Sequence, residues 1–244
     1  MRYAILADIH ANLTAFQAIL THAAQVGGFD AVWCLGDVVG YGPDPHECLE
    51  LLRRHRHLCV AGNHDLAAVG KIDTSDFNRD AAQANRWTAG QLTREDVEYL
   101  SRLPLTFREH DVTLVHGSPR QPIWEYILSP RDALDNFPLF DTPYCLVGHS
   151  HAPVVFERLG DNRCVAHLLA DGERIPLGAE RLIINPGGVG QPRDGDPRAA
   201  YAIYDADSRG VYHYRIEYDI QGTQQRMKKQ GLAPRLVARL AEGW

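Results

Sequence analysis

The residues best suited to chemistry in this sequence are five histidines that each stand beside Asp, Asn or Gly. They are His10, His64, His116, His149 and His151. Each follows a short apolar run, whereas the other histidines stand in no such motif and are expected to be structural or solvent-exposed. One coincidence of this kind would carry little weight, but five in one chain indicate a shared site.

Four of these histidines form a set of seven candidate metal ligands together with two nearby carboxylates and one amide. The set is Asp8, His10, Asp37, Asn63, His116, His149 and His151. Imidazole and oxygen ligands without thiolates suit Mn, Fe, Zn or a similar ion rather than an iron–sulfur cluster or a cysteine-rich zinc site. Seven ligands are too many for one tetrahedral ion, but they suit two ions that share a carboxylate. Two such ions can hold a phosphate group between them and activate a bridging water.

Five apolar runs precede these motifs and are expected to be buried β-strands. They are residues 3–7, 31–35, 58–61, 112–115 and 144–147. Helix-like stretches between several of them, such as 12–24 and 46–57, predict parallel strands joined by right-handed crossovers. Ligands bind at the carboxyl ends of parallel strands, so the five motifs should converge there. Glycines 36, 62, 117 and 148 would let the backbone turn sharply beside the ions.

The remaining chain is expected to complete one domain over residues 1–244, with two packed sheets and helices outside. Residues 71–103 lack a strand pattern and predict a helical excursion with a capping box at Thr93 to Asp96. Alternating strands are expected after residue 153 and should form a second, antiparallel, half-exposed sheet. They are residues 154–158, 163–169, 181–184, 200–205 and 211–218. Residues 222–244 predict a terminal helical tail, broken near Gly231 and Pro234.

Charge and cysteine content limit the cellular context and the partners. The net charge is −6 and Lys and Arg are scattered, which disfavours nucleic acid as a partner. The chain has five cysteines, which is an odd number, and none of them forms a CxxC pair. This pattern is typical of buried thiols in a reducing compartment. No apolar run reaches the length of a membrane span, and the first motif begins at Asp8, which leaves no room for a signal peptide. A cytoplasmic protein is the expectation.

Five ordered motifs in this chain resemble those of the calcineurin-like metallophosphoesterases. They are Asp8-Ile9-His10, Gly36-Asp37, Gly62-Asn63-His64-Asp65, His116-Gly117 and Gly148-His149-Ser150-His151. The resemblance extends from residue 3 to about residue 218. It implies an α/β fold, a four-layer α/β/β/α sandwich of two mixed sheets with helices outside, and a dinuclear metal site at the sheet edges.

The resemblance also implies a role for each matching residue. Asp8, His10, Asp37 and His151 would hold one ion, and Asp37, Asn63, His116 and His149 would hold the second, with Asp37 as the bridge. His64 would face the substrate, stabilise developing charge and protonate the leaving group, and Asp65 would orient the His64 ring. Two Mn ions are expected, with Fe, Zn, Ni or Co as alternatives.

Two further stretches, 36–43 and 185–193, are similar to the bacterial and archaeal phosphodiesterase-like branch of the same family. Relatives often carry Ser at position 188 and Gly at position 11, where this chain has Gly and Ala. Asn12, Tyr41 and Arg193 are candidate substrate contacts, although loop packing explains each of them equally well.

The resulting hypothesis is a metal-dependent phosphoesterase, either a phosphodiesterase or a phosphatase. A hydroxide bridging two metal ions would attack a small phosphorylated substrate. One alternative is a non-catalytic protein-binding scaffold of the same fold, which should lack a ligand or His64. Another is a DNA nuclease, which the acidic charge disfavours. The sequence leaves the substrate, the metal and the oligomeric state open.

Overall fold

The computed structural model describes residues 1–160 and 162–244, and its strands form two six-stranded mixed sheets. In spatial order the first sheet contains β3 (His57–Cys59), β2 (Ala31–Cys34), β1 (Arg2–Leu6), β11 (Ala199–Asp205), β12 (Gly210–Ile216) and β9 (Arg174–Pro176). The second contains β4 (Thr106–Glu109), β5 (Val112–Val115), β6 (Tyr144–Leu146), β10 (Arg181–Asn185), β7 (Val154–Leu159) and β8 (Arg163–Leu168). Parallel pairing links β1, β2 and β3 in one sheet and β5, β6 and β10 in the other.

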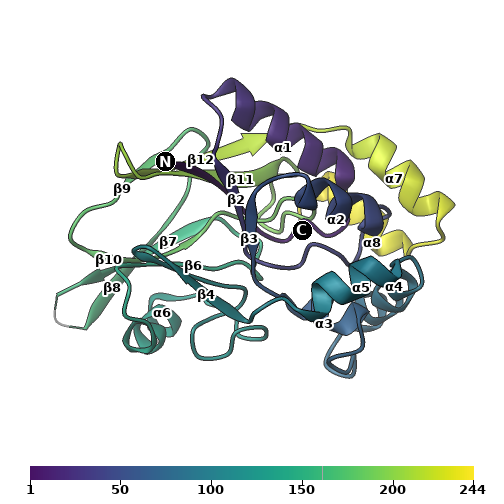
Figure 1. Ribbon diagram of the computed structural model, residues 1–244, viewed down its shortest axis with the longest axis horizontal. Coiled ribbons are helices and arrows are strands. Elements are labelled where there is room, and N and C mark those ends of the chain that lie inside the picture. Colours follow the sequence, from purple (N-terminus) through teal and green to yellow (C-terminus); the bar gives the residue numbers. More distant parts are fainter. Residues whose placement is uncertain (161) are drawn as a thin grey trace.

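The layers follow from strands that are apolar on both faces. In β1, Ile5 packs between the sheets with Leu114 and Leu146, whereas Leu6 faces the opposite way, toward Phe16 of α1 (Leu13–Gln25). The helix α2 (Pro45–Arg53) packs on the same outer face, and α6 (Pro130–Asn136) covers the outer face of the second sheet (Figure 1). This arrangement is the expected four-layer α/β/β/α sandwich.

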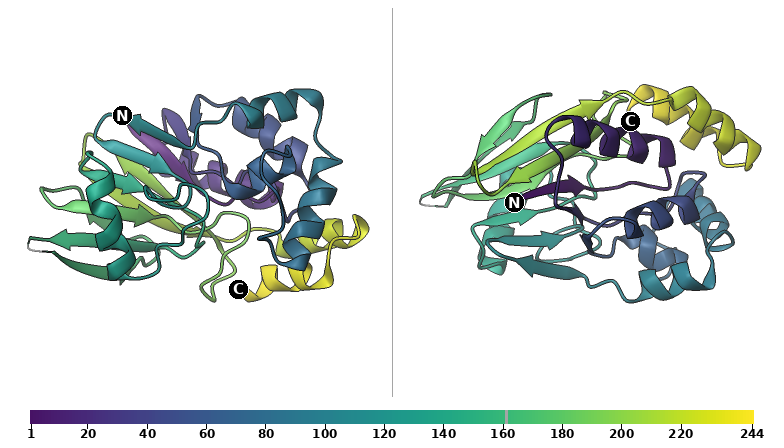
Figure 2. Two further views of the ribbon diagram at one scale, coloured as in Figure 1. Left: turned by 90° about the horizontal axis from the view of Figure 1, so that it is seen from below. Right: turned by 45° about the horizontal axis from the view of Figure 1, so that its top comes forward.

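Five further helices gather at one end of the sheets. They are α3 (Asn63–Ala68), α4 (Arg79–Ala89), α5 (Arg94–Ser101), α7 (Ile220–Lys229) and α8 (Pro234–Glu242). Both views in Figure 2 place the yellow C-terminal helices at the same end as α3 to α5. Helices therefore form where the patterns predicted them, and the capping box at Thr93 is confirmed. None of the helices in the described part of the chain is long and apolar enough to cross a membrane.

The expectation that the second half of the chain forms its own sheet is wrong. β11 pairs antiparallel with β1, and β10 lies between β6 and β7, so each half of the chain contributes to both sheets. The parallel strands would otherwise expose an edge of unpaired backbone groups, and the later strands cover that edge. As a consequence β11 is buried over six of its seven residues rather than half-exposed.

Short elements account for the other differences. The patterns did not indicate β4, β9 or α6, which are four, three and seven residues long. The helix predicted over 46–57 ends at Arg53, because His57 already begins β3.

We expect Asp96→Ala to lower the free energy of unfolding by about 3 kcal/mol, as removal of one partner of a buried ion pair typically does. The Asp96 side chain is fully buried and accepts hydrogen bonds from Arg53 (2.8 Å), His46 (2.8 Å) and the Thr93 backbone (3.0 Å). Urea unfolding at neutral pH measures the change. Glu98→Ala, at an exposed pair with Arg94, is the matched control and should change stability far less.

The same carboxyl should make stability depend on pH. Burial alone would raise the pKa of Asp96, but hydrogen bonds from Thr93, His46 and Arg53 hold this pKa below its usual value. A lowered pKa in the folded state stabilises the fold above the unfolded pKa of about 3.9, and this contribution is lost as the pH falls through the folded value. The gap between wild type and Asp96→Ala should therefore narrow below pH 4, and an unchanged gap would contradict the assignment.

Candidate metal centre

All seven predicted ligands lie at the carboxyl ends of the parallel strands. Asp8 and His10 follow β1, Asp37 follows β2, and Asn63 begins α3 just after β3. His116 follows β5, and His149 and His151 follow β6. The two sets of parallel strands end at the same edge of the sandwich, so residues more than 140 positions apart in the chain meet there.

Six of the seven residues form two buried clusters. One contains Asp8, His10 and His151 and the other contains Asp37, His116 and His149, with candidate ligand atoms within 4.8 Å of one another. The Asp37 Oδ2 atom lies 3.4 Å from His116 Nε2 and 3.7 Å from His10 Nε2. This carboxylate therefore stands between the clusters, where a bridging ligand would have to be.

Backbone carbonyls fix the proton position on each of the four histidine rings. The Nδ1 atoms of His10 and His151 lie 3.1 Å from Val39 O and 2.5 Å from Gln191 O. A carbonyl only accepts, so Nδ1 carries the proton in both rings. Their Nε2 atoms, 3.3 Å apart, then face each other with unshared electron pairs.

The second pair of histidines repeats this arrangement. His116 Nδ1 donates to Leu35 O (2.8 Å) and His149 Nε2 donates to Trp124 O (3.2 Å). The remaining nitrogens, His116 Nε2 and His149 Nδ1, lie 3.1 Å apart. Two electron pairs at this separation repel each other unless a cation or a proton lies between them.

The electrostatics of the site favour cations. Burial lowers the pKa of His10 and His151 well below the usual value, and that of His149 to about 3, so these rings are neutral. Burial would also lower the pKa of His116, but the Asp37 carboxylate raises it to about 9, which shows that positive charge is attracted there.

Two oxygen atoms at the site are buried and have no hydrogen-bond partner among the residues that the structure describes. They are Asp8 Oδ1 and Asn63 Oδ1, and a buried unpaired oxygen is costly. Asp8 Oδ2, by contrast, accepts from His149 N (3.0 Å), so the free oxygen is the one that lies 3.3 Å from His151 Nε2. The donor set therefore fits two divalent ions, with oxygen and nitrogen atoms left free on both sides.

The side chains of the predicted ligands are directed by strained backbone. Five of the predicted ligands have positive φ angles between 47° and 65°, in the left-handed region that such residues rarely adopt: Asp8, His10, Asp37, His149 and His151. Each such residue costs of order 1–3 kcal/mol unless its surroundings hold it. Backbone hydrogen bonds do so here, from Asp8 N to Gly36 O (3.1 Å) and from His10 N to Asp37 O (2.9 Å).

Gly62 is required by close packing. A Cβ atom at this position would lie 2.0 Å from Asp37 Oδ1. The loop after β3 therefore approaches the loop after β2 as closely as the backbone allows. In this position His64 N donates to Asp37 Oδ1 (2.9 Å), which leaves Asp37 Oδ2 facing the histidines.

Asp65 is placed differently from the expectation that it orients the His64 ring. Its carboxylate accepts from the backbone N–H groups of Asp37 (2.7 Å), Gly62 (3.0 Å) and Val39 (3.1 Å). These bonds fix the loop that carries Asp37, because a carboxylate at the start of α3 is close to three free backbone donors. In the described part of the chain, the side chain bonded to the His64 ring is that of Asn85, whose amide lies 3.4 Å from Nδ1.

Two buried asparagines were missed as positioning residues. Asn85 also donates to His64 O (3.0 Å), and Asn185 donates to Gly148 O (2.7 Å) and Ser150 Oγ (2.9 Å). Asn185 thereby holds the turn that carries His149 and His151. The 185–193 stretch gave a signal for Asn185, whereas the sequence around Asn85 reads as an ordinary helix.

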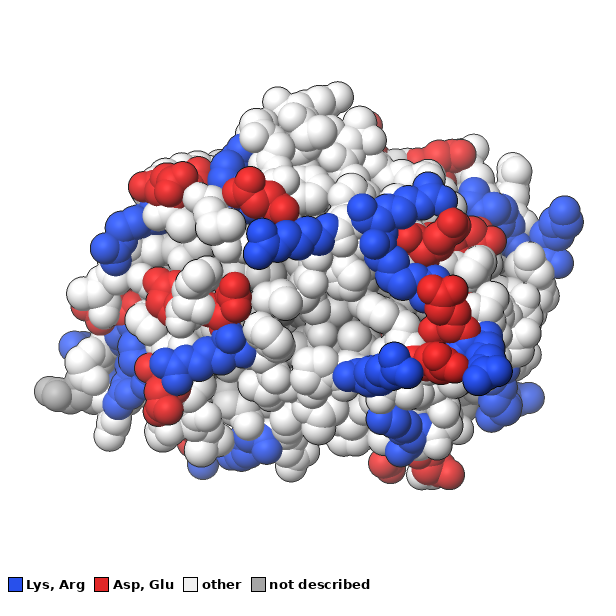
Figure 3. All heavy atoms as spheres, viewed as in Figure 1, with Lys and Arg blue, Asp and Glu red and all other residues white. Residues whose placement is uncertain are grey.

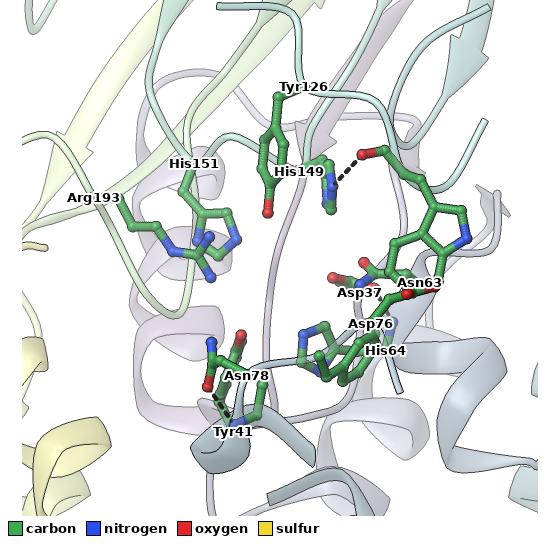
Figure 4. A pocket seen from close by; sticks show the side chains of 13 residues that line it. Asp37, Tyr41, Asn63, His64, Asp76, Asn78, Tyr126, His149, His151 and Arg193 are labelled. Atoms are coloured by element: carbon green, nitrogen blue, oxygen red, sulfur yellow. Dashed lines mark hydrogen bonds between the residues drawn. The ribbon is translucent and has the colours of Figure 1, made fainter. Parts of the chain in front are cut away.

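A cavity of about 140 Å³ opens over the two clusters (Figure 4). Its walls include four of the ligands together with His64, Tyr41 and Arg193. The remaining lining residues were not indicated by the sequence and are Asp76, Phe77, Asn78, Ala81, Trp124 and Tyr126. In the described part of the chain Arg193 donates to the Gln191 side chain and pairs with no carboxylate.

Asn12, the third candidate substrate contact, is not among the residues that line this cavity. Its side chain accepts from Ala15 N (3.2 Å), which caps α1, and donates to Gly190 O (3.0 Å). These bonds use its polar atoms in packing the loop. Tyr41 and Arg193 therefore remain as the two candidates from the sequence that can reach a substrate.

Known proteins show the same family signature and fold. A model of the calcineurin-like phosphoesterase superfamily domain matches residues 1–209. An uncharacterized protein of Methanocaldococcus jannaschii is 38% identical, over 98% of this chain and 97% of its own length. The crystal structure of a metallophosphoesterase from Sphaerobacter thermophilus superposes with a TM-score of 0.91 at 48% identity, covering 100% of this chain and 99% of that one. A symmetrical bis(5'-nucleosyl)-tetraphosphatase of Pectobacterium atrosepticum is 26% identical over 56% of this chain and 52% of its own length.

Asp37→Asn is expected to release both metal ions, because the carboxylate that stands between the clusters loses its charge while its shape is retained. His10→Asn should weaken one site only. Elemental analysis after dialysis measures both effects. Asp76→Asn, which removes a carboxylate from the cavity wall outside both clusters, should keep both ions. Equal metal content in Asp37→Asn and His10→Asn would rule out a bridging role.

Proposed function

We propose that this chain, which belongs to the calcineurin-like phosphoesterase superfamily, hydrolyses a small phosphate ester with two divalent metal ions. The observation that carries this proposal is the pairing of imidazole nitrogens, at 3.3 and 3.1 Å, that only a cation or a proton can hold so close, beside two buried oxygens with no hydrogen-bond partner among the described residues. Family membership supports a hydrolase, and the chemistry of the donor atoms supports metal dependence.

Each cluster would hold one ion. Asp8, His10 and His151 would bind the first, Asn63, His116 and His149 the second, and Asp37 would bind both. Bound ions would supply positive charge for the phosphate oxygens and a water of lowered pKa. Nitrogen and oxygen ligands of this kind suit Mn, which is the metal we propose, and they can also bind Fe, Zn, Ni or Co.

His64 is proposed to stabilise the leaving oxygen. Burial lowers the pKa of its ring to about 4, so the imidazole is neutral at pH 7. The Asn85 amide donates to Nδ1, which leaves the proton on Nε2 free to be donated to a substrate oxygen. Asp65 contributes through the backbone of the Asp37 loop rather than through the His64 ring.

Arg193 is proposed to bind the phosphate group. Its guanidinium borders the cavity, as Figure 4 shows, and lies 5.8 Å from the centre of the Tyr41 ring. A guanidinium without a carboxylate partner can donate two parallel hydrogen bonds to phosphate oxygens. Tyr41 would support the planar group from one side.

Surface charge favours a small substrate over nucleic acid. On the face in Figure 3, Lys and Arg are interleaved with Asp and Glu and form no continuous basic band. This face therefore lacks the positive surface that the phosphates of a long nucleic acid require, and the net charge of −6 also disfavours such a partner. The complete ligand set also favours an enzyme over a scaffold.

Removal of the metal should abolish activity. Chelation is expected to stop hydrolysis of an aryl phosphodiester, and Mn should restore it. The assay is release of nitrophenolate before and after the metal is added back. Chelator-resistant hydrolysis would contradict metal dependence, and no hydrolysis of phosphodiesters, monoesters or nucleotides with any metal would favour the scaffold. Diadenosine tetraphosphate belongs in that panel, because tetraphosphatases are among the relatives.

His64→Ala should lower kcat by roughly 10²–10³-fold, the usual loss when one hydrogen-bond donor to a developing negative charge is removed, while both metals stay bound. The loss should shrink for substrates with a good leaving group such as nitrophenolate, because that group needs little stabilisation of the charge on its oxygen. Steady-state rates and elemental analysis measure the two quantities. His110→Ala, at an exposed ring, is the control, and an emptied metal site in His64→Ala would show instead that His64 is a ligand.

A further inference from the structure

We propose that the cavity binds the base of a nucleotide against Phe77, Trp124 and Tyr126, so that the ester hydrolysed is a nucleotide. This inference rests on the proposed phosphoesterase function, which it makes more specific. It arises from three aromatic side chains that are not among the proposed metal ligands, on the loop between α3 and α4 and the loop between β5 and α6.

The aromatic surface begins at the residues of the metal centre. The Tyr126 ring stacks on the ring of His149, with centroids 3.9 Å apart and planes inclined by 16°. Phe77 lies 4.7 Å from the His64 ring, and Trp124 meets Phe77 edge to face at 5.6 Å. A phosphate held at the clusters would therefore place the rest of its ester beside these rings.

The loop that carries two of these rings is fixed in position. Between Trp124 and Tyr126, the Glu125 carboxylate pairs with Arg120 and accepts from Ser118 Oγ and from Asn136 Nδ2 (3.1 Å). Phe77 is fixed by a bond from its N–H to Thr74 O (3.1 Å). Rings held in place before binding lose little entropy when a ligand stacks on them.

The composition of the wall favours a planar heteroaromatic ring over an alkyl or lipid chain. Tyr126 remains 43% exposed, so its ring has a face free for contact. Ala81 is the sole aliphatic side chain among the described lining residues, whereas Asp76 and Asn78 add polar groups to the same cavity. Proteins typically bind a nucleobase by stacking aromatic rings on its face and by placing hydrogen-bonding groups at its edge.

A matched pair of esters tests the inference with the metal-loaded protein. The p-nitrophenyl ester of thymidine 5'-phosphate and methyl p-nitrophenyl phosphate share a leaving group and differ in the group that stays on phosphorus. Wild type should favour the thymidine ester by roughly 10- to 100-fold in kcat/KM, the range expected for stacking of one base. Trp124→Leu, which keeps apolar bulk without an aromatic face, should lose most of this ratio, as should Phe77→Leu.

Binding gives a readout that does not depend on turnover. Calorimetry should show adenosine 5'-monophosphate binding at least about 10-fold more tightly than ribose 5-phosphate, and Trp124→Leu should bring the two affinities together. Trp244→Leu, an exposed tryptophan outside the cavity, is the matched control and should keep the wild-type ratio. Circular dichroism confirms that each variant is folded.

The outcomes separate the inference from the proposed function. Metal-dependent hydrolysis of both esters at similar rates, with similar affinities for the two phosphates, would overturn nucleotide recognition and leave the phosphoesterase proposal standing. A preference that survives in both Trp124→Leu and Phe77→Leu would also overturn it. If neither ester is hydrolysed and monoesters and nucleotides are inert as well, the proposed function fails, and the affinity ratio alone decides whether the cavity recognises a base.

Discussion

The structure depends on two pairs of buried imidazole nitrogens, 3.3 and 3.1 Å apart, that repel each other unless a cation or a proton lies between them. Backbone carbonyls hold the far side of each ring, so the rings cannot turn away to relieve the repulsion. The buried carboxyl groups of Asp8 and Asp37 lie at the same place. Such an arrangement persists only if the rest of the fold is stable enough to bear it, and a cation that binds the folded state adds to that stability.

The two sheets supply this stability and also the geometry. Each sheet contributes three parallel strands whose carboxyl ends meet at one edge, and the strands of the second half cover the open sides of β1 and β6. Apolar side chains fill the space between the sheets and both outer faces. The strained loops therefore begin and end in rigid strands, which is the condition under which left-handed backbone at Asp8 or His149 can be maintained.

The sequence predicted the parts of the site that depend on local pattern. Apolar runs that end in Asp, Asn or His placed all seven ligand candidates at strand ends, and the capping box at Thr93 is a short-range signal. Sheet membership was not predictable in the same way, because β10 and β11 are assigned by pairing partners far away in the chain. The part played by Asp65 was missed for a related reason, since two of its three backbone partners, Asp37 and Val39, lie on another loop that only the folded chain brings near.

Trp124 shows how a fixed candidate metal centre can coexist with a variable binding wall. Its backbone carbonyl holds His149, whereas its side chain lines the cavity. Any residue at this position supplies the carbonyl, so the side chain is free to change without disturbing the ligand set. The residue types in the strand-end motifs are restricted, because their nitrogen and carboxylate oxygen atoms must meet at one site. The loop side chains are restricted only by the groups that they contact. Resemblance at the motifs therefore indicates the type of reaction, whereas the substrate has to be inferred from the side chains of the loops.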